Sequence, residues 1–194
     1  MVLGSADIDL DIVLSDSLLE VPPVKVAQWV ALEAKSFDSL GFPERLGFIF
    51  LITRFLKWMI LPSTENYRRV PSFMRPTDTQ VEVPHSMCFD LIPWPDIRDA
   101  LILDPTYHHT LARTSLGIAP FLSVNWQYSP GDIIEFDMSD GTWKLSALFE
   151  RHIEDAGNWS VEHEAVDRMP ILESKAGNGE RMNKTRNLQG EAQL

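Results

Sequence analysis

Cysteine is almost absent from this chain: Cys88 is the only one in 194 residues. A single cysteine excludes an internal disulfide and every zinc pattern that needs several cysteines. The first sixteen residues are acidic and lack the basic-then-apolar order of a secretory signal. We therefore expect an intracellular, cytoplasmic location.

Positive charge is also scarce. Lysine and arginine number 17 against 28 aspartates and glutamates, which gives a net charge of −11. The densest basic pair, Arg68–Arg69, is too small to form a phosphate-binding surface. Nucleic-acid-binding domains carry a basic patch, and anionic membranes attract basic segments. We therefore expect neither nucleic acid nor a membrane as a partner.

Motifs for cofactors and for nucleophilic catalysis are missing. There is no glycine-rich phosphate loop, no nucleotide fingerprint and no Ser–His–Asp signature. His163-Glu164-x-x-Asp167 differs from the zinc-protease pattern at its second ligand, and no third ligand is evident. Cys88 lies between Met87 and Phe89 and is interpreted as a packed thiol. We expect no metal and no cofactor.

The most prominent segment that is present is Glu44 to Leu61, ERLGFIFLITRFLKWMIL. Pro43 suits the first helical position and Pro62 ends the helix, so the segment is predicted to be one α-helix. It is apolar nearly all round, so other elements must cover it on several sides. Thr53, Arg54 and Lys57 form one narrow polar stripe, which either reaches solvent or pairs with acids that line a cavity. The segment is too short and too charged to cross a bilayer, which takes about 20 apolar residues.

The rest of the chain predicts a mostly α-helical, single compact domain. Residues 1–23 are an N-terminal arm, 24–172 the helical domain and 173–194 a disordered polar tail. Prolines after residue 62 predict a long ordered coil through residue 84, with one short helical turn near Asn66–Arg69. Asp140-Gly141 predicts a small β-hairpin between residues 133–137 and 142–146. Further short helices are expected, and their ranges are 24–37, 95–103, 104–111, 147–156 and 161–169.

Two polar clusters have competing interpretations. Asp90, Asp96, Arg98 and Asp99 form a mixed-charge group, in which the planar fork of Arg98 ties coil carbonyls or a carboxylate together, or polarises a substrate. The pair His108–His109 also has two interpretations. In the first, a surface histidine stands beside a partly buried one. In the second, His109 is a hydrogen-bond donor or proton shuttle in a pocket.

Several separated motifs occur in an order that resembles a known family. They are Trp58 to Pro62, Arg75-Pro76-Thr77 with Gln80, Val83-Pro84-His85, Asp90 with Ile92-Pro93-Trp94-Pro95, Arg98-Asp99 with Leu101, Asn125-Trp126, Phe149 to Ile153, and Asn158-Trp159. Together they resemble the domain of unknown function that follows the basic leucine zipper in many fungal transcription-factor-like proteins. The resemblance spans roughly residues 25–172 and implies a mostly helical fold without an agreed activity. No basic region or zipper accompanies the motifs here, so DNA binding is not implied.

Our leading hypothesis is a cofactor-independent enzyme of fungal secondary metabolism. A cyclase or isomerase, including a pericyclic [4+2] type, needs only an aromatic pocket that holds an apolar small-molecule substrate in a reactive conformation. Tyr107, His109 and Arg54 are the candidate catalytic donors. The candidate substrate-binding residues are the aromatic side chains Trp58, Phe89, Trp94, Trp126, Tyr128 and Trp159. This hypothesis requires a closed apolar cavity of at least a few hundred Å³.

The alternative is a regulatory or ligand-sensing module that does no chemistry. Such a module binds a partner transcription factor or a ligand, and an exposed apolar patch is then expected in place of an enclosed pocket. A domain that only forms a homodimer is a third possibility.

Overall fold

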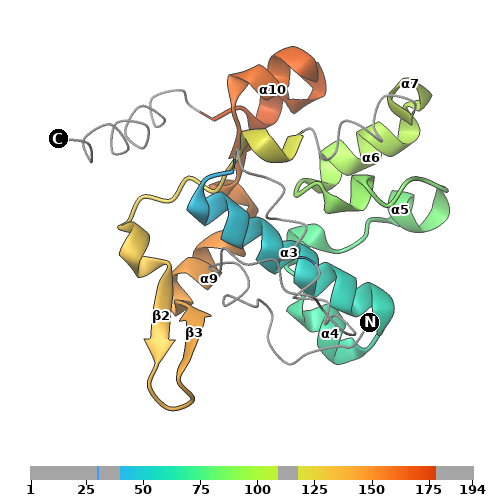
Figure 1. Cartoon of the computed structure of the whole chain (residues 1–194). Coiled ribbons are helices and arrows are strands. Elements are labelled where there is room, and N and C mark those ends of the chain that lie inside the picture. Colours follow the sequence, from blue (N-terminus) through green and yellow to red (C-terminus); the bar gives the residue numbers. More distant parts are fainter. Residues whose placement is uncertain (1–29, 31–39, 109–117, 178–194) are drawn as a thin grey trace, which may run out of the picture.

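The computed structural model describes Val30, residues 40–108 and residues 118–177. The predicted arm at 1–23, the predicted helix at 24–37 apart from Val30, His109 and the tail from residue 178 lie outside the described residues. Within the described part the fold is mostly helical, as predicted, and has one small β-hairpin (Figure 1).

Helix α3, Phe42–Ile60, is the central element. Pro43 lies in its first turn, as predicted, and Leu61 follows its last residue. Figure 1 shows the helices of residues 78–108 on one side of α3, and helix α9, Ala147–Ile153, with the hairpin on the other. The predicted burial on several sides is therefore confirmed for most of its length.

The polar stripe of α3 is partly buried, and its arginine pairs with acids. Thr53 and Lys57 are buried. Arg54 stacks on the Phe50 ring at 3.8 Å and forms ion pairs with Glu150, at 3.7 Å, and with Glu154, both at α9. The arginine of the stripe therefore pairs with acids, as one interpretation expected, and ties α3 to α9.

Short helices follow α3 in the proline-rich segment. They are α4 (Thr64–Arg69), η1 (Ser72–Met74), α5 (Asp78–Glu82), η2 (Phe89–Leu91), α6 (Pro95–Leu103) and α7 (Pro105–His108). The prediction of helix α6 is confirmed, and Pro95 begins it. Residues 62–84 contain more helix than the predicted coil. A capping box formed by Thr77 and Gln80 starts α5 within this segment.

The second half of the described chain contains two small antiparallel sheets. Strands β2 (Ile134–Asp137) and β3 (Thr142–Leu145) form the predicted hairpin, and Gly141 has φ of +71° in its turn. Strand β1 (Leu122–Ser123) pairs with β4 (Ser160–Val161). The remaining helices are η3 (Ala119–Phe121), η4 (Pro130–Asp132), α9 (Ala147–Ile153), η5 (Ala156–Asn158), α10 (His163–Arg168) and η6 (Pro170–Lys175).

Several boundaries differ from those predicted. The helix expected over residues 161–169 begins at His163, because Val161 belongs to β4. Helix α9 ends at Ile153, three residues before the predicted Ala156, because Asp155 caps a separate 3-10 turn. At the carboxyl end, η6 extends through the predicted boundary at residue 172, and Ala176 bridges to Val161 of β4. The described fold therefore includes residues 173–177, which were predicted to be disordered.

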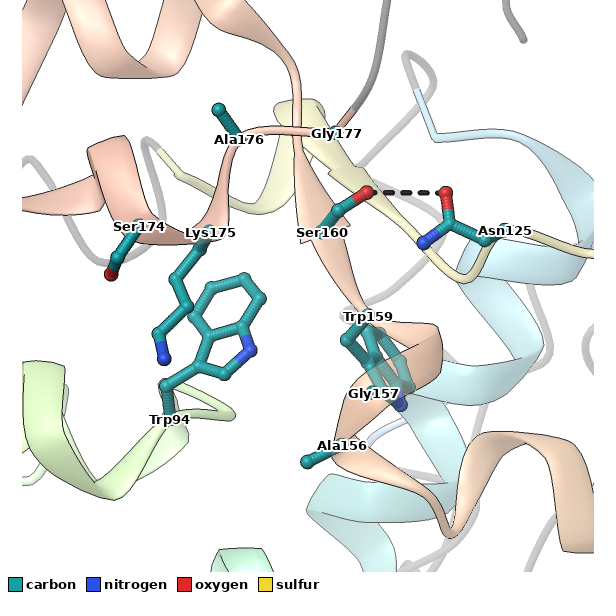
Figure 2. Close-up of a pocket in the computed structure, with 10 residues that line it drawn as sticks. All are labelled: Trp94, Asn125, Ala156, Gly157, Trp159, Ser160, Ser174, Lys175, Ala176 and Gly177. Atoms are coloured by element: carbon teal, nitrogen blue, oxygen red, sulfur yellow. Dashed lines mark hydrogen bonds between the residues drawn. The ribbon is translucent and has the colours of Figure 1, made fainter.

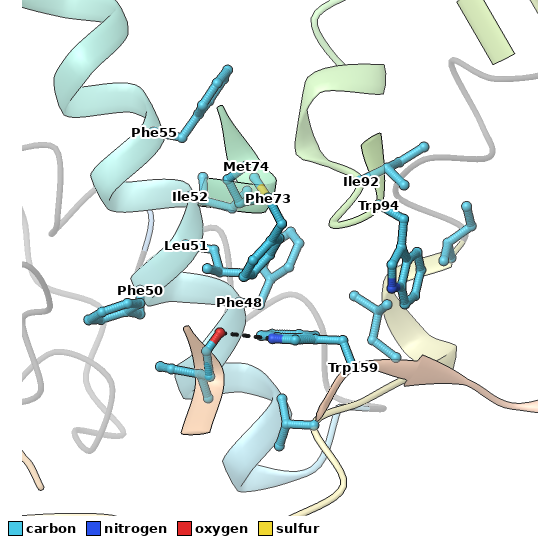
Figure 3. Packing of buried hydrophobic residues seen from close by; sticks show 14 of the residues in the cluster. Phe48, Phe50, Leu51, Ile52, Phe55, Phe73, Met74, Ile92, Trp94 and Trp159 are labelled. Carbon is cyan, nitrogen blue, oxygen red and sulfur yellow. Dashed lines mark hydrogen bonds between the residues drawn. The ribbon is translucent and has the colours of Figure 1, made fainter. Parts of the chain in front are cut away.

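The core surrounds α3 and takes residues from nearly every segment. Figure 3 shows Phe50 on the opposite side of the helix from Leu51, and Trp159 beside the helix. The Trp159 indole N–H donates to the Ile153 carbonyl at 2.9 Å. A Cβ at Gly47 would lie 3.0 Å from this indole, so the absence of a side chain there lets the tryptophan pack against the α3 backbone.

Candidate functional site

Arg98 is the largest side chain that is fully buried in the described fold. Its guanidinium donates to Gln80 Oε1 at 2.8 Å, to the Ile92 carbonyl at 2.8 Å and to the Arg75 carbonyl at 2.9 Å. Burial lowers the pKa of Arg98 to about 10, partly offset by nearby carboxylates, so the side chain stays charged at neutral pH. The predicted structural fork of Arg98 is therefore observed, with its bonds to coil carbonyls and to an amide.

The same network continues to a buried carboxylate. Asp90 Oδ1 accepts from Gln80 Nε2 at 2.5 Å and from His85 Nε2 at 2.9 Å. The other ring nitrogen of His85 lies 2.6 Å from the Val83 carbonyl oxygen. Both of these partners are acceptors, so the geometry favours the protonated ring, in which both nitrogens donate. His85 therefore has no free lone pair with which to act as a general base.

The pKa of His85 follows from this geometry. Burial alone would lower the pKa, but the bonds to the Val83 carbonyl and the Asp90 carboxylate, with the Asp90 charge, raise it above its ordinary value. Protonated His85 therefore stabilises the folded state. This contribution is complete below the unfolded pKa of about 6.5 and is lost as the pH rises through the higher folded pKa.

We expect His85→Gln to destabilise the fold more at low pH than at high pH. At pH 5.5 the variant should lose about 1.5–3 kcal/mol, the range for a hydrogen bond to a charged group, and the difference should shrink toward pH 9. Urea unfolding of both proteins at several pH values measures it. A difference that stays constant from pH 5.5 to pH 9 would show that folding does not raise the pKa of His85.

An open cleft of about 490 Å³ lies between α3 and α5, and we call it the α3–α5 cleft. The residues that line it are Phe55, Trp58, Met59, Pro76, Gln80, Val81, Glu82, Val83, Pro84, His85, Met87 and Asp90. Its walls are mainly apolar. Of its four polar members, Gln80, His85 and Asp90 belong to the Arg98 network, whereas Glu82 is exposed. Three rim side chains are strongly exposed: Met59 at 46%, Val81 at 77% and Met87 at 52%. A rigid polar base therefore holds an apolar rim that faces solvent.

A second cleft, of about 510 Å³, lies between α6, β4 and η6 (Figure 2). We call it the β4–η6 cleft. Trp94 and Trp159 line it, and Figure 2 shows the Lys175 side chain running beside the Trp94 indole. The Lys175 amino group pairs with Asp96 at 3.0 Å. Polar groups of Ser174 and of the backbone complete the lining, so this cleft is more polar than the first.

Asn125 has a structural role at the edge of the second cleft. It is the only non-glycine residue of the described chain with a positive φ, at 48°. Its side chain accepts from Ser160 at 3.2 Å and donates to the Asn158 carbonyl at 2.9 Å. The amide thereby ties the β1 strand end to the η5–β4 segment.

The predicted catalytic residues do not assemble in either cleft. Arg54 is ion-paired with α9, and Tyr107 packs against the core at α7. His109 lies outside the described residues. Both clefts have the predicted size, but each includes exposed residues, so neither is the closed apolar cavity that the enzyme hypothesis requires.

The predicted substrate-binding aromatics divide into four locations. Trp58 lines the α3–α5 cleft, whereas Trp94 and Trp159 line the β4–η6 cleft. Phe89 is buried in the core. Trp126 packs against Tyr128, Phe149 and His152, with ring centroids 4.9 to 5.1 Å apart. Trp94 and Trp159 therefore share a cleft, and Trp126 and Tyr128 share a ring cluster.

The sequence prediction missed Gln80 as the centre of the polar network. The signal was present as the Thr77-x-x-Gln80 spacing of a capping box, in which the Gln80 amide oxygen accepts from the Thr77 N–H at 3.1 Å. Thr77 also donates to Asp99 on α6 at 2.5 Å. The bond to Asp99 connects the start of α5 to the helix that carries Arg98.

Two further properties concern only the described residues. No three side chains of the His, Cys, Asp or Glu types come together there as a metal site. No helix in that part of the chain is long and apolar enough to cross a membrane.

The comparisons with known proteins identify a family. Comparison with curated proteins and with solved structures found no match. The model of one family, described as a domain of unknown function (DUF3425), matches residues 53–177. The match begins within α3 and ends at Gly177. It therefore includes residues 173–177, which also belong to the described fold although the predicted boundary was at 172. Because it covers more than half of the chain, the protein belongs to this family of domains of unknown function.

Proposed function

We propose that this domain is a regulatory interaction module that binds a protein partner through the α3–α5 cleft. The observation that carries the proposal is the exposed apolar rim of Met59, Val81 and Met87 around an open cleft of about 490 Å³. Exposed apolar patches on soluble proteins mark interaction sites. Methionine-rich rims are common on binding surfaces because their side chains adapt to the partner.

The partner proposed is an amphipathic helix from a leucine-zipper transcription factor. A helix in a groove places apolar side chains from one face against the cleft walls. The sequence resembles domains that accompany leucine zippers, and this supports the choice of partner. The polar base supports binding over chemistry, because His85 has both ring nitrogens engaged as donors.

We expect Met87→Glu to weaken binding of such a partner at least about tenfold, because a carboxylate would be buried against apolar side chains. Met87 is half exposed, so the substitution should change the free energy of unfolding by less than about 0.5 kcal/mol. Affinity is measured by calorimetry with purified leucine-zipper proteins, which a pull-down against a panel of zippers selects.

The matched control is Met138→Glu, which changes a methionine of the hairpin turn that is 86% exposed. This control should bind the partner with unchanged affinity. The proposal fails if both variants bind equally well or are weakened equally.

A small-molecule enzyme is the second candidate, and one observation favours it. Two of the predicted substrate-binding aromatics, Trp94 and Trp159, line the same cleft of about 510 Å³. An apolar substrate such as a carbonyl-bearing polyene would lie against the indoles, with its carbonyl near Lys175. Saturable quenching of tryptophan fluorescence by a polyene, with product detected by mass spectrometry, is the expected result. If the polyene causes no quenching and no product is detected, this candidate is excluded.

A further inference from the structure

A segment with net positive charge adjoins the α3–α5 cleft of this acidic protein. Residues 53–76, which contain the end of α3, α4 and η1, include five basic residues and one acidic residue. The five are Arg54, Lys57, Arg68, Arg69 and Arg75. The chain as a whole has a net charge of −11, so this segment has the opposite sign to the rest.

Two of these arginines have no carboxylate partner. Arg54 pairs with acids at α9 and Arg69 pairs with Glu65. No carboxylate of the described residues lies within ion-pair distance of Arg68 or Arg75. Arg68 is exposed, and Arg75 donates only to the backbone carbonyls of Val70 and Arg68. The segment therefore presents two charges that an acidic binding partner would neutralise.

A chain of ring contacts connects these charges to the cleft. The Arg75 guanidinium lies 5.1 Å from the Tyr67 ring centroid, and Tyr67 lies 5.5 Å from Trp58. Trp58 lines the cleft, as does Pro76, which follows Arg75. The apolar surface continues past Met59 to Ile60 and Leu61, which are exposed. An acidic and apolar peptide would therefore meet arginines on one side and apolar side chains on the other.

Residues 1–23 of the same chain have this composition. They contain five acidic residues and no basic one. Their apolar cluster, Leu18, Leu19 and Val21, lies directly before Pro22–Pro23. Val30, seven residues after the arm in the sequence, is buried in the core. Twenty-three extended residues reach up to about 75 Å, about twice the diameter of a domain of this size.

We propose that the acidic arm, residues 1–23, binds in cis across Arg68, Arg75 and the α3–α5 cleft and competes there with the partner helix. This inference rests on the proposed function, because it assigns the regulation of that binding site. A tethered segment acts at an effective concentration in the millimolar range, so weak intrinsic affinity is enough for it to compete. The electrostatic part of the contact is screened by salt.

Disulfide trapping in the full-length chain tests the proposal. One variant carries Ser17→Cys and Val81→Cys in a Cys88→Ser background, since Val81 is 77% exposed on the cleft rim. The matched control carries Ser17→Cys with Met138→Cys on the hairpin turn. Under mild oxidation, the bond between positions 17 and 81 should form at least about ten times faster than the bond between 17 and 138, and Arg68→Glu should slow it. Arg168→Glu on α10 should leave the rate unchanged.

Equal rates for the two pairs, or no effect of Arg68→Glu, would overturn the proposal. Partner affinity is then measured on the trapped 17–81 protein before and after reduction. Reduction should restore binding if the arm competes for the cleft, and equal affinity before and after reduction would overturn competition. If the partner binds the wild-type protein but the 17–81 and 17–138 bonds form at equal rates, the proposed function stands and only the role of the arm is excluded. If the 17–81 bond forms preferentially but the Met87→Glu variant binds the partner with unchanged affinity, the contact of the arm stands and the proposed partner site is excluded.

Discussion

Replacing Arg98 by methionine is expected to lower the free energy of unfolding by about 3–5 kcal/mol, the cost of breaking a buried charge network at one partner. Methionine fills similar volume but donates no hydrogen bond. It would leave Gln80 Oε1 and the carbonyls of Ile92 and Arg75 without their donor. It would also remove a buried cation that interacts electrostatically with the Asp90 carboxylate. Urea unfolding followed by circular dichroism measures the loss.

Arg168→Met is the matched control for this substitution. Arg168 is exposed on α10 and pairs with Glu164 four residues earlier, so its loss should cost less than about 1 kcal/mol. Arg98→Lys should also be strongly destabilised, because one ammonium group does not reproduce three bonds from a planar fork. A loss below about 1 kcal/mol for Arg98→Met would show that the network does not hold the base of the α3–α5 cleft.

Replacing Trp159 by alanine is expected to cost about 3–5 kcal/mol. The indole is buried against the α3 backbone, and its N–H satisfies the Ile153 carbonyl. The substitution leaves a cavity beside Gly47 and an acceptor without its donor. Urea unfolding measures this loss as well.

A double-mutant cycle with Gly47→Ala tests the packing directly. In the wild-type background the added methyl would lie 3.0 Å from the indole and 3.2 Å from a Val124 methyl, which should cost about 1–3 kcal/mol. Without the indole the same change should be neutral or stabilising, because alanine favours a helix over glycine by about 1 kcal/mol. Equal effects of Gly47→Ala in both backgrounds would contradict direct contact between Trp159 and α3.

The parts of the fold that the sequence predicted are those with local signals. Proline at both ends marked α3, and its apolar surface required burial on several sides. Asp140-Gly141 marked the hairpin, because the turn needs a residue at positive φ. Arg98 was predicted as a structural fork because a planar guanidinium suits several carbonyls at once.

The parts that could not be predicted depend on contacts between distant residues. Helix α5 has only five residues, and the Thr77–Asp99 bond to α6 helps to hold it in place. The aromatic residues lie mainly in segments without periodicity, so nothing in the sequence indicates whether Trp58, Trp94 or Trp126 faces a cleft, the core or solvent. For the same reason the proposed catalytic set of Arg54, Tyr107 and His109 rested on residue type alone, and the described members do not meet in a cleft.

Nuclear magnetic resonance of methionine methyl groups tests the proposed interface most directly. Met59 and Met87 line the α3–α5 cleft, Met74 and Met169 are buried, and Met138 is exposed on the hairpin turn. With methyl-labelled methionine, addition of a leucine-zipper partner should shift and broaden the Met59 and Met87 signals and leave the Met138 signal unchanged. Binding that shifts the Met138 signal while those of Met59 and Met87 stay in place would contradict the assignment of the cleft as the partner site.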